Sequence, residues 1–344
     1  MKESVMQYTL DVLRGILAQD SPVGFTKKAV DFALNELRGM GYAPTLTRKG
    51  NVLCCLGGTD ADNGLFLSAH IDTLGAIVAE VKGNGRLRLS PAGGFEPNNI
   101  ETECVRVYTY DGKVYEGTIQ LVNASLHVNK DYRTTQRTFQ TVECVLDEDV
   151  HSAEDVQALG IDNGCFVCAD PRTVITESGY IKSRFLDDKL SAAILLGFAR
   201  YLREENITPA RRIWLQLTVY EEEGHGASAT MPEGVTEMLG VDMGCIGDGL
   251  KCTEKDVSIC AKDNSGPYNY EMTTRLAALA KEKNIRHVVD VYPLYSSDCS
   301  AAVQTFDVKH ALIGPGVYAS HGYERSHVDA VKNTFDLLCA YAEV

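Results

Sequence analysis

The residues of this sequence that could carry out chemistry are acids and histidines placed where apolar segments end. The apolar run 65–69 leads directly into His70-Ile71-Asp72, and the apolar run 213–219 leads to three consecutive glutamates. In open α/β sheets, ligands bind beyond the carboxyl ends of the strands, so side chains that follow different strands can meet at one edge. We therefore expect one site built from separate segments, with the candidate residues His70, Asp72, Asp187, Glu221, Glu222, Asp248 and His321.

This set of side chains is suited to a pair of divalent metal ions. Zn²⁺ binds imidazole nitrogen and carboxylate oxygen, and a catalytic site leaves a position for water. Two Zn²⁺ carry +4, which one hydroxide (−1) and three carboxylates (−3) would bring to zero; the three are Asp187, Glu222 and Asp248. Asp72 is expected to accept a hydrogen bond from the ring nitrogen of His70 that does not bind metal. Such ligands accept zinc, cobalt or manganese alike, so the sequence leaves the metal open.

Each of these features also has an ordinary structural interpretation. A run of three glutamates is commonly a solvated, charged face. Asp187-Asp188 could be the N-cap and first-turn acid of the helix that follows. Asp248-Gly249 is a common turn, and His321 and His327 could both be surface residues. It is their joint occurrence at the ends of separate strands and helices that favours a metal site.

The elements that must position these residues alternate between strand and helix. Apolar residues recur at helical spacing in 5–18, in a segment after Ser21-Pro22, in 190–202 and in 331–342. Strand-like runs are expected at 43–48, 51–56, 65–69, 213–219, 244–247, 287–291 and 308–313. Alternating strands and helices predict an α/β fold with a mostly parallel sheet flanked by helices.

A different texture interrupts this pattern between residues 76 and 174. Short alternating segments such as 105–108 and 114–119 are separated by turn signals such as Asp111-Gly112. This pattern predicts a β-rich domain inserted into an α/β domain made of residues 1–75 and 175–344.

The composition excludes several classes of protein. The 344 residues include 33 basic and 47 acidic side chains, a formal net charge of −14, which argues against a nucleic-acid partner. No run approaches 18 apolar residues, and Met1-Lys2-Glu3-Ser4 does not begin a signal peptide, so we expect a cytoplasmic protein with no membrane partner. The 11 cysteines have no secretory context and are interpreted as small buried side chains. Cys165 and Cys168 have redox spacing, but their alternation with apolar residues indicates a strand.

The order of the motifs resembles a known family. The sequence contains His-x-Asp at 70–72, Leu-Asp-Asp at 186–188, Glu-Glu-x-Gly at 221–224, an Asp after a short strand, and a late His. This order is similar to that of the tetrahedral aminopeptidases, which include glutamyl and deblocking aminopeptidases and were sometimes labelled endoglucanases. The resemblance spans nearly the whole chain, including the β-rich insert between the first two motifs.

The resemblance implies a di-metal aminopeptidase that hydrolyses N-terminal residues from peptides with a water held between the ions. It also implies that the insert is a lid and dimerisation domain, and that dimers assemble into a hollow dodecamer. By this resemblance His70 and Asp248 would bind one metal, Glu222 and His321 the other, Asp187 both, with Glu221 as the general base and Asp72 orienting His70.

Several alternatives remain at this stage. The glutamate register could be shifted by one, with Glu222 as base and Glu223 as ligand, and His327 could replace His321. A related co-catalytic zinc deacylase or carboxypeptidase would use a similar ligand set. A glycoside hydrolase would use paired carboxylates, although Trp214 is the only tryptophan available to stack on a sugar. A protein that keeps the site only as a scaffold is the remaining alternative.

Overall fold

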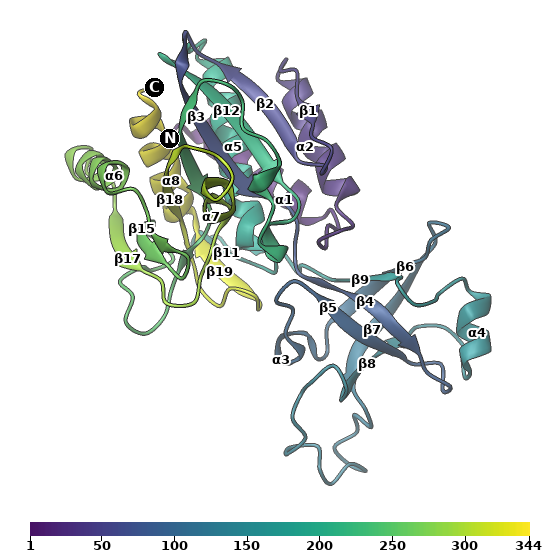
Figure 1. The fold of residues 1–344 in the computed structure, drawn as a ribbon. Coiled ribbons are helices and arrows are strands. Elements are labelled where there is room, and N and C mark those ends of the chain that lie inside the picture. The colour runs from purple at the N-terminus through teal and green to yellow at the C-terminus, as the bar shows by residue number, and fades with distance from the viewer. The chain divides into compact units, whose positions relative to one another are not determined.

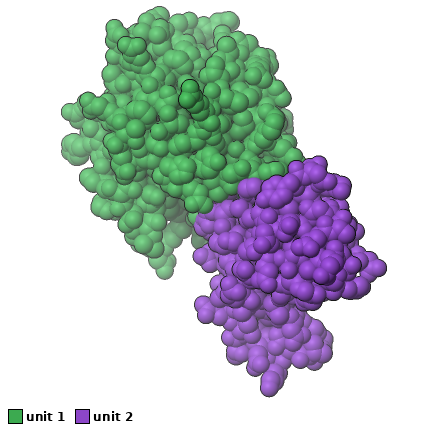
Figure 2. Space-filling model, turned by 45° about the vertical axis from the view of Figure 1, so that its right-hand side comes forward, with its two compact units in different colours: residues 1–72, 172–344 green, residues 73–171 purple.

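The computed structural model describes residues 1–344, which divide into two compact units (Figures 1 and 2). Unit 1 comprises Met1–Asp72 and Arg172–Val344, and unit 2 comprises Thr73–Pro171. The sequence placed these boundaries at 75/76 and 174/175. None of the helices is long and apolar enough to cross a membrane.

Unit 1 is built on a ten-stranded sheet in which the central strands are parallel. The strand order is β1-β2-β12-β3-β13-β18-β15-β16, with β14 beside β18 and β17 beside β15. β12, β3, β13 and β18 run parallel to one another. β2 pairs antiparallel with β12, and β15 pairs antiparallel with β18. The bounds are β1 Thr45–Leu46, β2 Val52–Gly57, β3 Asp60–His70, β12 Arg211–Thr218, β13 Val235–Val241, β14 Gly244–Cys245, β15 Val257–Asp263, β16 Gly266–Pro267, β17 His287–Val291 and β18 Lys309–Val317. This arrangement confirms the mostly parallel α/β sheet expected from the sequence.

The central strands are apolar because helices cover them. The second half of β3, from Gly64 to His70, is largely buried, as expected for a parallel strand covered on both faces. Helix α5 (Leu186–Glu204) packs on β3, β13 and β18 and against α1 (Glu3–Leu17), where Gly197 leaves space for Thr9. The other helices of unit 1 are α2 (Lys27–Gly39), α6 (Tyr270–Glu282), α7 (Asp298–Val303) and α8 (Val328–Ala342).

A small three-stranded sheet connects two segments that are distant in sequence. Its order is β10-β11-β19, with bounds β10 Val174–Ile175, β11 Tyr180–Ser183 and β19 Glu324–His327. β11 leads into the start of α5, and β19 begins three residues after His321. β11 and β19 lie side by side (Figure 1). Their pairing therefore brings the start of α5, with Asp187, close to the segment before β19, with His321.

Unit 2 is a closed β-barrel. Its strands follow the order β4-β5-β8-β7-β6-β9, with bounds β4 Gly75–Val81, β5 Leu87–Ala92, β6 Cys104–Tyr108, β7 Val114–Leu121, β8 Val142–Leu146 and β9 Phe166–Ala169. Helices α3 (Pro97–Ile100) and α4 (Ala153–Ala158) lie between strands in the sequence. Cys165 and Cys168 are buried at β9, and every cysteine of the chain is a free thiol. The β-rich character expected for this segment is confirmed.

One expected strand is wrong in a way that matters for the site. The sequence suggested a strand at 244–247 that would end at Asp248, but β14 is only Gly244–Cys245. β3 lies between β12 and β13. β13 was not predicted, because Thr236, Glu237 and Gly240 interrupt the apolar pattern of that segment in the sequence. Glu237 is tolerated there because Arg211 on β12 forms an ion pair with it.

Candidate metal centre

His70 lies at the carboxyl end of β3 and is almost fully buried. Its Nδ1 is 3.0 Å from the backbone oxygen of Asp72, and 3.7 Å from the Asp72 carboxylate. The expected hydrogen bond to the Asp72 carboxylate is therefore replaced by one to the Asp72 carbonyl. This contact orients the ring so that Nε2 faces the other acids, 3.1 Å from Oδ1 of Asp187.

The Asp72 carboxylate instead holds the segment that carries the paired glutamates. Its two oxygens accept the backbone N–H groups of Glu221 and Glu222, each at 3.2 Å. The glutamates form a short 3₁₀ turn, η1 (Glu221–Glu223), that ends at Gly224 with φ 74°, a left-handed conformation that favours glycine. Asp72 thus positions both glutamates through their main chain.

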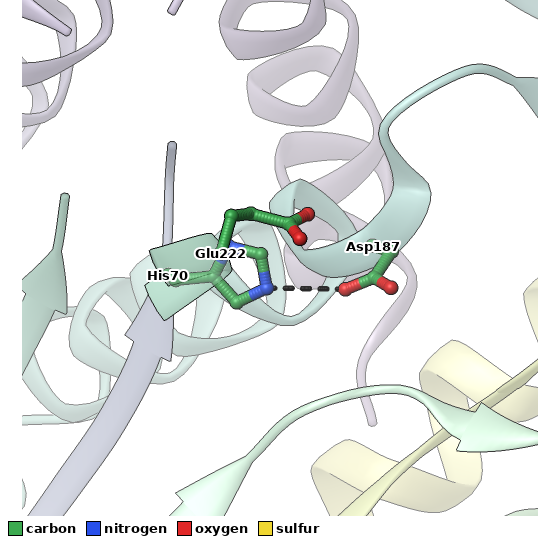
Figure 3. A group of neighbouring side chains, drawn as sticks. All are labelled: His70, Asp187 and Glu222. Atoms are coloured by element: carbon green, nitrogen blue, oxygen red, sulfur yellow. Dashed lines mark hydrogen bonds and ion pairs between the residues drawn. The ribbon is translucent and has the colours of Figure 1, made fainter. Parts of the chain in front are cut away.

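The glutamate register agrees with the expected assignment. Glu221 Oε2 lies 3.7 Å from His70 Nε2, and the Glu222 side chain groups with His70 and Asp187 (Figure 3). The Glu223 side chain is exposed. The geometry therefore does not favour the shifted register with Glu223 as a ligand.

The loop after the glutamates is tightly fitted. A Cβ on Gly226 would lie 2.7 Å from both carboxylate oxygens of Asp298. Asp298 is buried and accepts hydrogen bonds from the Ala227 backbone N–H and the Thr218 hydroxyl. This residue connects the end of β12 to the loop that follows the glutamates.

Asp187 occupies the irregular start of α5. Phe185 has φ 67°, the Asp187–Asp188 peptide bond is cis, and regular helical geometry begins only after Asp188. Asp187 points one oxygen toward His70 and the other toward His321, whose Nε2 is 3.6 Å from Asp187 Oδ2. The two oxygens of the Asp187 carboxylate thus each approach a different imidazole.

His321 joins this cluster and His327 does not. The His321 Nε2 atom is also 3.6 Å from Oε2 of Glu222. The His327 ring lies elsewhere, with Nε2 2.9 Å from the Ser178 carbonyl and Nδ1 accepting the Asp329 backbone N–H at the start of α8. The preference for His321 over His327 thus agrees with the geometry.

The structure does not bring Asp248 to the cluster. Asp248 lies on an exposed turn after β14, and Asp242, the residue directly after β13, is buried beside His70 and Asp188. The sequence analysis missed Asp242 because it missed β13, although an Asp directly after the segment Met238-Leu239-Gly240-Val241 was an available signal. Asp188 was also given only a helix-start interpretation, yet it is buried and its Oδ2 accepts the His70 backbone N–H at 3.3 Å.

The electrostatics of the cluster show an excess of buried negative charge. Burial is the largest influence that raises the pKa of Asp72 to about 6 and of Asp242 to about 7, and for Asp242 the nearby Asp187 adds to it. Burial likewise raises the pKa values of Asp188, Glu221 and Glu222 well above the ordinary range. The carboxylates of Asp187, Asp72 and Asp242 raise the pKa of Glu222 further by like charge, and His70 opposes them. The pocket therefore holds too little positive charge to balance its carboxylates.

In two residues, His70 and Asp187, the pKa shift favours the charged form of the side chain. Burial opposes the charged imidazolium, yet the hydrogen bond to Asp187 and the surrounding acids raise the pKa of His70 well above its usual value. Burial would raise the pKa of Asp187 too, but His70 and His321 lower it on balance. One buried histidine charge is insufficient for this many carboxylates.

Divalent cations fit the donor set that remains. His70, Asp187 and Glu222 place ligand atoms within 4.8 Å of one another, as do His70, Asp188 and Asp242. Two buried carboxylate oxygens, Oε1 of Glu222 and Oδ1 of Asp188, have no hydrogen-bond partner. Unpaired buried carboxylate oxygens are costly unless a cation or donor meets them, and imidazole with carboxylate is a zinc-type ligand set.

Comparison with known proteins shows the family and fold of this chain. Residues 50–337 match the M42 glutamyl aminopeptidase family. The chain is 40% identical over 336 residues, 97% of each protein, to YhfE of Bacillus subtilis (strain 168), whose name describes it as a candidate aminopeptidase. In fold, it resembles the TET aminopeptidase of a marine sediment archaeon, Thaumarchaeota archaeon SCGC AB-539-E09 (TM-score 0.87, 18% identity, 96% of both chains). It also resembles the TET1 peptidase of Pyrococcus horikoshii, described as assembling into a tetrahedron or a large octahedral shell (TM-score 0.84, 20% identity, 97% and 99% coverage). The chain therefore belongs to the M42 glutamyl aminopeptidase family.

Proposed function

We propose that this M42 aminopeptidase uses two divalent cations, bound at the cluster around Asp187, to release the N-terminal residue of peptides. The observation that carries the proposal is the pair of ligand groups that share His70, set among buried carboxylates that lack counter-charge. In this assignment one ion is held by His70 and Asp242 and the other by Glu222 and His321, with Asp187 shared. Asp242 takes the place that the sequence gave to Asp248.

When bound, the ions would lower the pKa of a water molecule between them and polarise the carbonyl of the scissile bond. The residues of the chain supply the proton transfer. Glu221 Oε2 lies at the edge of the ligand cluster, 3.7 Å from His70 Nε2, and is not needed as a ligand in this assignment. Burial raises the pKa of Glu221, which suits a group that accepts a proton from water and then donates it to the leaving amine. Water adds to the carbonyl carbon, the C–N bond breaks, and the amine leaves with that proton.

Charge also supports exopeptidase action. At least six buried or partly buried carboxylates would contribute −6 when ionised and two divalent ions +4, so the site would keep a net negative charge of at least −2; the six are Asp72, Asp187, Asp188, Glu221, Glu222 and Asp242. A residual negative charge favours the α-ammonium group of a free N-terminus over an internal peptide segment. An N-acylated substrate lacks that positive charge.

Metal analysis combined with substrate assays tests the proposal. Purified protein is expected to bind two ions per chain, zinc, cobalt or manganese, and to cleave aminoacyl-nitroanilides. N-acyl amino acids, the substrates of the related deacylases, are expected to remain intact. Removing the ions with a chelator should abolish turnover, and returning them should restore it. Activity that persists in metal-free protein would refute the proposal.

We further propose that the chain forms a homo-oligomer, with unit 2 as the lid and dimerisation domain. The support is the family membership and the assemblies named for the TET structures of similar fold. Light scattering coupled to size-exclusion chromatography tests it, with a dodecamer as the expected species and a monomer as the contrary result.

A further inference from the structure

We infer that Glu324 is a positioning residue that sets the distance between the two candidate ligands Asp187 and His321. This inference rests on the proposed function, since it assigns a role in binding the second ion. Glu324 lies in neither ligand group, so the role assigned to it acts through the residues that it holds.

Glu324 joins two separate segments with one buried carboxylate. It begins β19 and pairs with Ser183, the last residue of β11. Its Oε2 accepts the backbone N–H of Asp187, and its Oε1 accepts the backbone N–H of His321, each at 3.0 Å. The side chain is only about 2% exposed, so water does not compete for these hydrogen bonds.

The pairing of β11 with β19 brings the two segments together, but the backbone around the ligand residues themselves is irregular. His321 has φ 62°, and Phe185, two residues before Asp187, has φ 67°, so both ligand segments contain a non-glycine residue in the left-handed region. Conformations of this kind persist only where surrounding contacts enforce them. The Glu324 carboxylate bonds to both segments and thereby fixes the 3.6 Å approach of His321 Nε2 to Asp187 Oδ2.

A charged group is an expensive way to make a purely structural link. The Glu324 carboxylate is buried and accepts the backbone N–H of the candidate ligand Asp187, so its negative charge is costly without a cation nearby. Two backbone amides could be joined by neutral acceptors at lower desolvation cost. A buried carboxylate becomes favourable once cations occupy the neighbouring ligands, so its presence agrees with a site that is built for the metal-bound state.

Asp72 provides a parallel within the same site. Its two oxygens accept the backbone N–H groups of Glu221 and Glu222, as those of Glu324 accept the N–H groups of Asp187 and His321. Two buried carboxylates thus each hold two candidate site residues through the main chain. Outer residues that orient ligands in this way typically contribute 10- to 100-fold to metal affinity.

Titration of metal-free protein with Co²⁺ alone, followed by calorimetry and by the visible absorption of the bound ion, tests the inference. Glu324→Gln keeps the side-chain volume but leaves only one carbonyl oxygen for two N–H donors. Wild-type protein is expected to bind two Co²⁺ per chain. The variant should bind the ion assigned to Glu222 and His321 about 10- to 100-fold more weakly, and the other ion, which shares only Asp187 with it, should be affected by a smaller factor. A matched control is Glu254→Gln, which removes a carboxylate that contacts Arg325 of the same strand but no site residue; its titration should match wild type.

A second comparison separates positioning from general stability. In a His321→Ala background, Glu324→Gln should cause a smaller further loss of Co²⁺ affinity than it causes in wild type, because the part of its effect that acts through His321 is already missing. If Glu324→Gln does not fold, Glu324→Asp, which withdraws the carboxylate by one methylene, is titrated instead. It should also weaken the binding of the ion assigned to Glu222 and His321. Wild-type affinity for both ions in the folded variant overturns the positioning role and leaves the proposed function intact. A wild-type chain that binds no Co²⁺ overturns the proposed function itself.

Discussion

Substituting the three consecutive glutamates one at a time tests the assignment of the site most directly. Glu221→Gln keeps the shape of the side chain and its backbone hydrogen bond to Asp72, but it removes the group that accepts the proton. General-base catalysis contributes about 10²- to 10⁴-fold, so kcat should fall by that factor, equivalent to about 3–5 kcal/mol in the activation barrier. Two ions per chain should remain bound, because Glu221 is not among the assigned ligands.

The two neighbouring glutamates provide the contrast. Glu222→Gln replaces a carboxylate that approaches His321 within 3.6 Å, so it should lose the second ion along with activity. Glu223→Gln alters an exposed side chain and should keep both ions and wild-type kcat. The assay is aminoacyl-nitroanilide turnover with metal content measured on the same samples. A Glu221→Gln variant that holds two ions and turns over within a few-fold of wild type would refute the general-base assignment.

Three further predictions concern ligands, protons and packing. Asp242→Asn should weaken the binding of one ion by more than about 100-fold, which exceeds the effect expected for residues that only orient ligands. Asp248→Asn should leave metal affinity, measured by calorimetric titration, and activity unchanged. In metal-free protein, the raised pKa of Asp242, about 7 against 3.8 in the unfolded chain, makes the folded state less stable as pH rises between those values. Thermal unfolding in chelator should therefore show a Tm that falls from pH 4 to pH 7, and added ions should reverse the trend, since binding displaces the protons. A Tm that rises over this range in chelator would contradict the reasoning. Gly226→Ala should reduce stability by about 1–3 kcal/mol and lower kcat, because its Cβ would lie 2.7 Å from the Asp298 carboxylate, while Gly247→Ala meets nothing within 4 Å and serves as the control in denaturant unfolding.

Much of the site could be predicted from the sequence because its residues directly follow or precede regular elements. His70 ends an apolar strand, Asp187 begins a long apolar helix, and Glu221 follows another strand by a short step. Each such position is encoded locally, by hydrophobic pattern and chain order. The expectation that they meet required only the rule that parallel strands place their carboxyl ends at one edge of the sheet.

Long-range pairing decided the rest. β13 contains polar and small residues that do not follow a typical strand pattern, and it is recognised as a strand by its pairing with β3 and β18. Only the folded chain therefore shows that Asp242, and not Asp248, lies near His70. The connection made by Glu324 depends on β11 pairing with β19, two segments about 140 residues apart. Sequence thus determined which kinds of side chain are present and which ends of elements carry them. Only the tertiary structure decided which carboxylates are buried together. The pKa of a group depends on the burial and the charges around it in space, whichever part of the chain supplies them.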